Sequence, residues 1–103
     1  MRILWLDDIR DPGAHGYAGA TWVKSYEEAI CALNSGVFDF ASLDHDLGVA
    51  STIGLRERTG YDVLCYIEEH ELWPLHGVSV HSSNPSGKEK MLAGIRRHYG
   101  RTF

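Results

Sequence analysis

Apolar residues gather in four short runs along the chain, and polar stretches with a helical repeat separate the later runs. The first run, Ile3–Leu6, lacks polar alternation, which is typical of a strand covered on both faces. The other predicted strands are Thr21–Val23, residues from about 38 to 43, and residues 77–80. Turn formers at residues 9–13 and a loop to about Gly19 fill the space between the first two strands.

Three helices are predicted between and after these strands. The first starts at a capping box over residues 25–28, buries Ala29, Ile30 and Leu33, and ends at Gly36. The second runs from about Gly60 to Glu69 with Thr59 as its cap, and it buries Val63, Leu64 and Ile67. The third starts near Ser86 or Gly87, and its apolar face is Met91, Leu92 and Ile95. We expect residues 72–75 to pack on the core as part of one domain, although Leu72, Trp73 and Leu75 could instead form a dimer patch.

Residues 47–59 form a long predicted loop that carries two glycines and two arginines: Gly48, Gly54, Arg56 and Arg58. Arginine beside glycine suits closure over a phosphate, because its planar fork matches phosphate oxygens. A disordered surface loop is the alternative.

The alternation of strands and helices predicts a parallel sheet with helices on both faces. At 103 residues there is room for one domain with one modest core, so we expect a single domain over residues 1–103. No segment approaches the roughly 20 apolar residues that a membrane helix needs. The first apolar run ends in acid after four residues, unlike a signal peptide, so a cytoplasmic protein is expected. Cys31 and Cys65 are expected to be buried free thiols on helix core faces.

Charge is distributed unevenly along the chain. The net charge is −4, but residues 86–103 carry five Lys or Arg and a single Glu, so the remainder is strongly acidic. An acidic body argues against broad binding to duplex DNA, which needs many phosphate contacts. A small phosphorylated ligand or a single RNA end remains compatible with it, and a solvated helix face is the alternative reading of the basic segment.

Three predicted strands end in polar clusters. These clusters are Asp7-Asp8, Asp44-His45-Asp46 and His81-Ser82-Ser83-Asn84. Because ligands bind at the carboxyl ends of parallel strands, we expect one site there. The carboxylates of these clusters could stay ionised close together only around a cation, and oxygen donors favour Mg²⁺ or Mn²⁺. The expected ligands of this cation are Asp7, Asp8, Asp44 and Asp46. Zinc is the alternative, since His45 and His81 offer nitrogen, but a short-spaced Cys/His signature is absent.

The two histidines of these clusters suit a general acid and base pair. His45 and His81 would project from neighbouring strands on either side of a reacting phosphorus, although each could instead be a hydrogen-bonded structural residue. The start of the last helix is a candidate anion site. The expected phosphate-binding residues are Arg10, Ser82, Ser83, Asn84 and Lys88. Arg10 could instead pair with a carboxylate, and Ser86 could be a mere helix cap.

The acidic pair after the first strand, Asp44 after the third and a hydroxyl after the fourth resemble the receiver domain of response regulators. That resemblance implies magnesium binding by Asp7, Asp8 and Asp44, with phosphoryl transfer to Asp44. The chain departs from the pattern: no fifth strand carries the family's lysine, the first helix is shrunken, and His45 and His81 are foreign to it.

A second resemblance extends along nearly the whole chain, to the cyclic-phosphate-processing receiver-like domains. The motifs that carry it are residues 4–12, residues 42–48, residues 59–62, and residues 81–85 with Gly87. It implies a single flavodoxin-like three-layer α/β sandwich with four parallel strands in the order 2-1-3-4. It also implies RNA-repair or nucleotide-signalling contexts in bacteria and phages.

These observations together predict a metal-assisted phosphoesterase acting on a 2′,3′-cyclic phosphate RNA end or a cyclic nucleotide. In this interpretation Asp44, His45 and His81 are the catalytic residues. A sensor or sponge that holds such a ligand uncleaved is the alternative, because one pocket could serve either role. A phosphoacceptor receiver is the third hypothesis.

Overall fold

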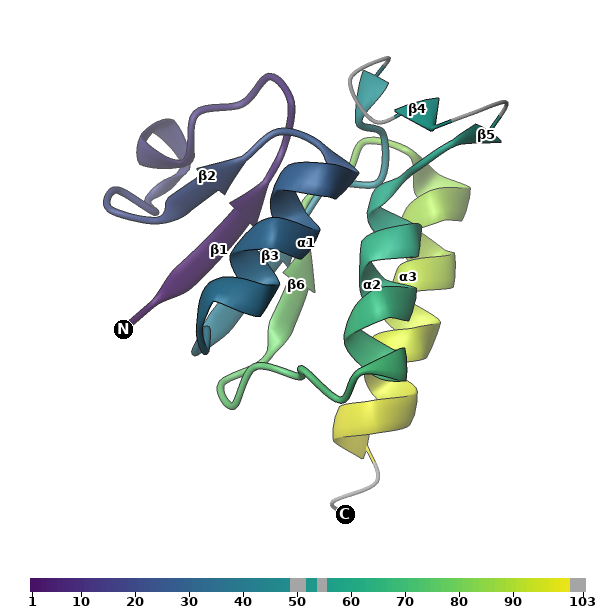
Figure 1. Cartoon of the computed structure of the whole chain (residues 1–103). Helices are drawn as coiled ribbons and strands as arrows, with labels where there is room; N and C mark the ends of the chain where they lie inside the picture. Colours follow the sequence, from purple (N-terminus) through teal and green to yellow (C-terminus); the bar gives the residue numbers. More distant parts are fainter. Residues whose placement is uncertain (49–51, 54–55, 101–103) are drawn as a thin grey trace.

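A parallel sheet of four short strands forms the centre of the computed structural model (Figure 1). The strands are β1 (Ile3–Leu6), β2 (Thr21–Val23), β3 (Phe40–Leu43) and β6 (Val78–Val80), in the order β2-β1-β3-β6. The structure describes residues 1–48, 52–53 and 56–100, with 52–53 and 56–57 described by their backbone only. The predicted strand order 2-1-3-4 is confirmed, although β3 begins two residues later than expected.

Three α-helices follow the strands: α1 (Tyr26–Ser35), α2 (Gly60–Glu69) and α3 (Pro85–Tyr99). Ser25 caps α1 by accepting the N–H of Glu28, and Thr59 begins α2 in a capping box. The third helix starts earlier than predicted, because Asn84 accepts the N–H of Gly87 and Pro85 fits the first helical position. Ser86 is therefore inside the helix and is not its cap.

Alternation along the strands gives the sheet two different faces. Leu4 pairs with Ala41 and Ala41 with Val78, and all three belong to the single buried cluster that the helices cover. In Figure 1 α2 and α3 lie side by side, and α1 contacts α2. On the opposite face of the sheet Trp5 pairs with Ser42, and no α-helix among the described residues packs there.

The cover of this opposite face consists of a short 3-10 helix, η1 (Pro12–His15), and the loop after it. Tyr17 of this loop stacks against Trp5 at 5.3 Å between ring centroids and against Phe40 at 6.2 Å. Within the described residues, the three α-helices pack on the face of the sheet that contains Leu4 and Ala41. The expectation of helices on both faces is therefore wrong, and the layer on the other face is η1 with its loop. The turn formers at residues 9–13 are too few and too rich in proline and glycine for a longer helix.

Several local expectations are also corrected. Cys31 and Cys65 are free but exposed. Each lies two positions from buried residues of its helix, and residues i and i+2 do not share a helix face. Leu75 is 82% exposed, whereas Leu72 and Trp73 pack against the core.

The predicted loop after β3 contains a two-stranded antiparallel hairpin, β4 (Thr52–Ile53) with β5 (Arg56–Glu57). Gly54 lies outside the described residues, as does the side chain of Arg56. Arg58 is described: it approaches Asp62 at 3.9 Å and lies 5.3 Å from the ring centroid of Tyr26. Within the described parts of the chain, none of the helices is long and apolar enough to span a membrane.

Candidate functional site

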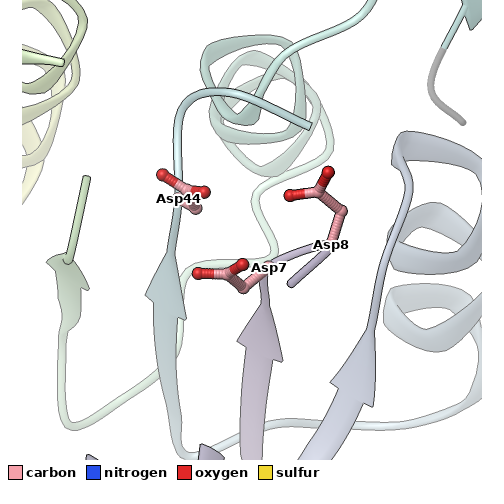
Figure 2. Close-up of side chains that lie close together, drawn as sticks. All are labelled: Asp7, Asp8 and Asp44. Carbon is pink, nitrogen blue, oxygen red and sulfur yellow. The ribbon is translucent and has the colours of Figure 1, made fainter. Parts of the chain in front are cut away.

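Three carboxylates meet at the carboxyl edge of the sheet. Asp7 and Asp8 follow β1, Asp44 follows β3, and one oxygen of each lies within 4.8 Å of the others (Figure 2). Asp7 is fully buried and Asp44 is 5% exposed, while Asp8 is half-buried. An open pocket of about 330 Å³ lies over them, and Asp46, Ile9, Arg10, Gly48 and Ser83 complete its lining.

Asp7 is the most heavily bonded of the three carboxylates. Its Oδ1 accepts the backbone N–H groups of Ile9 at 2.8 Å and Arg10 at 2.9 Å. Its Oδ2 lies 3.1 Å from Arg10 Nη1 and 3.1 Å from His81 Nε2. Burial raises the pKa of Asp7, but the backbone N–H groups, the Arg10 guanidinium and His81 outweigh burial and bring that pKa below its ordinary value. Asp7 is therefore ionised at neutral pH.

Asp44 has the opposite electrostatic balance. Burial and the charge of Asp7 raise its pKa above the ordinary value. Hydrogen bonds from Ser82 and from the His45 backbone N–H, and the Arg10 guanidinium 3.6 Å from Asp44 Oδ2, lower the pKa only in part. Two neighbouring carboxylates with opposite pKa shifts are thus held at one site, a pattern common at functional sites.

The chemistry of the donor set fits a hard divalent cation such as Mg²⁺ or Mn²⁺. Three aspartates supply oxygen alone, and Asp8 makes no hydrogen bond or ion pair within the described part of the chain. The Arg10 guanidinium lies at the same carboxylates, because it forms ion pairs with both Asp7 and Asp44. Of the predicted ligands, Asp46 is not among the three gathered carboxylates: its side chain is 61% exposed and bonds His45.

His45 is held by Asp46 on one side and by α3 on the other. Its Nδ1 lies 2.8 Å from Asp46 Oδ1, and Asn84 Nδ2 donates to the same oxygen at 3.3 Å. The ring lies so close to Gly87 that a Cβ built there would come within 2.6 Å of it. Within the described residues, its other nitrogen, Nε2, has no hydrogen-bond partner.

His81 is held differently, with both ring nitrogens engaged. Nδ1 lies 2.8 Å from the hydroxyl of Ser42, and Nε2 reaches Asp7. Its ring stacks on Trp5 with centroids 4.0 Å apart and planes 4° apart. Burial lowers the pKa of His81 below its ordinary value, although Asp7 opposes that shift. The two histidines predicted as a pair therefore have different environments.

The predicted phosphate-binding residues are spread more widely than their sequence positions suggest. Ser83 lines the pocket, whereas the hydroxyl of Ser82 accepts the Asn84 N–H at 3.1 Å. Asn84 caps α3 with its side-chain oxygen. Lys88 is exposed on the first turn of α3 and makes no side-chain contact with the pocket among the described residues. Their phosphate role stays a prediction.

Sequence reasoning did not single out Ser42, Ser79, Trp5 or Gly87 as parts of the site. The signal for the first two was strand alternation: residues 42, 79 and 81 share a sheet face with Trp5 by register. Ser42 is a small polar residue in a buried strand, and it lies two positions before Asp44. Because alternate residues of a strand point to the same face of the sheet, this spacing indicates that Ser42 faces the site.

A family model described as the cyclic-phosphate processing receiver domain matches residues 2–97. No curated protein matched the chain.

Proposed function

Because the chain belongs to the family of cyclic-phosphate processing receiver domains, we propose that it is a metal-assisted phosphoesterase. Its substrate in this proposal is a cyclic phosphate, either a 2′,3′-cyclic phosphate at an RNA end or a cyclic nucleotide. The family match supports the substrate class, and the pocket over three carboxylates supports the use of a cation.

The observation that carries the proposal is the hydrogen bond between His45 and Asp46, because Asp46 lines the pocket over these carboxylates. Opening a cyclic phosphate with water requires removal of a proton from the water and delivery of a proton to the departing alkoxide. A histidine with one nitrogen bound to a carboxylate and the other free can do both. His45 Nε2 would take the proton from water, and Asp46 would stabilise the resulting imidazolium through Nδ1.

Asp7, Asp8 and Asp44 would hold Mg²⁺ or Mn²⁺, which supplies positive charge for the phosphoryl oxygens when bound. Hydrogen bonds within the chain orient these carboxylates. Two backbone N–H groups donate to Asp7, and the Ser82 side chain donates to Asp44. Ser83 lines the pocket where a phosphate oxygen would lie.

The test is incubation of the protein with 2′,3′-cyclic and 3′,5′-cyclic nucleotides and with cyclic-phosphate-ended RNA, in Mg²⁺, Mn²⁺ or EDTA, read by chromatography. We expect a linear phosphate product that disappears with EDTA. His45→Ala should lower turnover by about 10²–10⁴-fold, the usual contribution of a general acid or base. His76→Ala, an exposed histidine outside the pocket, is the matched control.

A non-catalytic sensor or sponge is the second candidate, and one observation favours it. Arg10 already contacts Asp7 and Asp44 from within the chain, so the pocket contains one positive charge without a divalent cation. Retention of a cyclic nucleotide without product in every metal condition would select this candidate and contradict the phosphoesterase.

A further inference from the structure

We propose that His81 is a positioning residue that holds the carboxylate of Asp7 for a divalent cation and transfers no proton. The inference rests on the proposed function in that Asp7 is taken as a cation ligand. It assigns to His81 a role different from that of His45, with which the sequence pairs it.

The first support is a continuous row of hydrogen bonds that ends on Asp7. Ser79 Oγ donates to Ser42 Oγ at 3.0 Å, Ser42 Oγ lies 2.8 Å from His81 Nδ1, and His81 Nε2 lies 3.1 Å from Asp7 Oδ2. Two members of this row are buried: Ser42 is 1% exposed and Asp7 is 0% exposed.

The second support is the direction in which hydrogens must run along this row. Asp7 is ionised and its carboxylate can only accept, so His81 Nε2 carries a proton and donates it to Asp7. In the neutral ring Nδ1 is then an acceptor. The Ser42 hydroxyl therefore donates to Nδ1 and accepts from Ser79. Neither nitrogen is left to exchange a proton with a substrate.

The third support is that packing fixes the orientation of the His81 ring. His81 stacks on Trp5 almost coplanar, and Trp5 is itself 1% exposed and donates its indole N–H to the Arg10 carbonyl at 2.8 Å. The ring cannot rotate toward the pocket without leaving this stack and both hydrogen bonds. Hydrogen-bonded partners of this kind orient metal ligands, and their loss costs about 10–100-fold in metal affinity.

The test compares His81→Gln with His81→Ala. A glutamine amide can donate to Asp7 much as Nε2–H does, but it carries no proton at neutral pH. Using Mn²⁺ alone as the probe and electron paramagnetic resonance as the readout, we expect His81→Ala to bind about 10–100-fold more weakly and His81→Gln to recover most of the loss. Turnover of a cyclic nucleotide by His81→Gln should recover in parallel, and His76→Ala should match the unaltered protein.

Nitrogen-15 NMR of the unaltered protein at fixed pH provides a readout that needs neither cation nor substrate. We expect the His81 ring to carry its proton on Nε2 alone, and Ser42→Ala to keep this tautomer, because Asp7 still accepts from Nε2. A proton on Nδ1 in the unaltered protein would overturn the proposal.

The remaining outcomes separate this inference from the proposed function. His81→Gln that binds Mn²⁺ normally but turns over no better than His81→Ala would make His81 a proton carrier and overturn the inference. Absence of turnover with every substrate, together with the expected Mn²⁺ affinities, would overturn the phosphoesterase and leave the positioning role supported. Failure of the unaltered protein to bind Mn²⁺ would remove the cation site and this role with it.

Discussion

Replacing Asp44 by Asn should stabilise the protein in EDTA and destabilise it relative to the unaltered protein once Mg²⁺ or Mn²⁺ is added. Asp44 is buried, and its raised pKa means that the folded state disfavours its charge. For a carboxyl group whose pKa is raised on folding, stability falls as pH rises from the unfolded pKa through the folded pKa, so the charged form costs stability at neutral pH. Asparagine removes that cost and keeps the shape.

The size of the effect follows from three opposing contributions. Repulsion from the Asp7 carboxylate, whose oxygen lies within 4.8 Å, is about 3.5 kcal/mol at an effective dielectric constant of 20. Attraction to Arg10 at 3.6 Å is about 4.6 kcal/mol on the same scale. Burial of the charge costs several kcal/mol more. Hydrogen bonds from Ser82 and the His45 backbone N–H add to the attraction. The direction of the Asp44 pKa shift shows that burial and repulsion prevail over these and Arg10, and we expect a net gain of about 1 kcal/mol in Asp44→Asn.

Thermal unfolding by circular dichroism measures this gain, which corresponds to a rise of about 4–8 °C in Tm for a domain of this size. Adding Mg²⁺ or Mn²⁺ at a hundred times its Kd should stabilise the unaltered protein by about 2.7 kcal/mol and Asp44→Asn much less. Glu69→Gln, which removes an exposed charge on α2, should change stability by less than about 0.5 kcal/mol. A lower Tm for Asp44→Asn in EDTA would refute the reasoning, because the carboxylate would then be a net source of stability.

Three further predictions concern the residues around the pocket. Gly87→Ala should lower turnover, because its Cβ would meet the His45 ring at 2.6 Å and the ring would have to shift; a melting curve beside steady-state kinetics separates this effect from a loss of stability. Gly48→Ala should weaken Mn²⁺ binding, measured by calorimetry, because Gly48 has a φ of +62° and the new Cβ would meet Asp8 Oδ2 at 2.8 Å. The hydrogen bond from His45 lowers the pKa of Asp46, so Asp46 stabilises the fold above the usual carboxyl pKa, and this stability is lost as pH falls through the lowered value. Asp46→Asn should therefore lose less stability than the unaltered protein between neutral and acidic pH, as measured by urea unfolding.

The sequence predicted the elements well where one physical rule decided the outcome. Apolar runs located the strands, and the shared carboxyl edge of a parallel sheet brought Asp7 and Asp44 together from distant segments. The predicted burial of Cys31 is wrong because Cys31 lies two positions from the buried Ala29 and Leu33, and such positions do not share a helix face. The start of α3 was missed because two hydroxyl or amide residues could cap it, and the choice of Asn84 depends on Pro85 entering the first turn.

The separate environments of the two histidines could not be predicted from the sequence. Both follow strands and both neighbour carboxyl-edge residues, so residue type and spacing make them equivalent. Their difference arises from neighbours in space: Ser42 and Trp5 hold His81, whereas Asp46 and the close approach of Gly87 hold His45. Such contacts depend on strand register and on which way a side chain turns, and a single sequence specifies neither.

The hydrogen bond between His81 and Asp7 also links positions 74 residues apart, so the site is closed by one of the most non-local contacts in the chain. Closing a loop of this length costs conformational entropy that is repaid only when the flanking strands have docked. Ser83, which lines the pocket, and His81, which holds Asp7, both follow β6, so the complete site requires the last strand of the sheet. Hydrogen exchange at the His81 amide, which donates to the Leu43 carbonyl at 3.1 Å, would report directly on the cooperative unfolding of the whole domain.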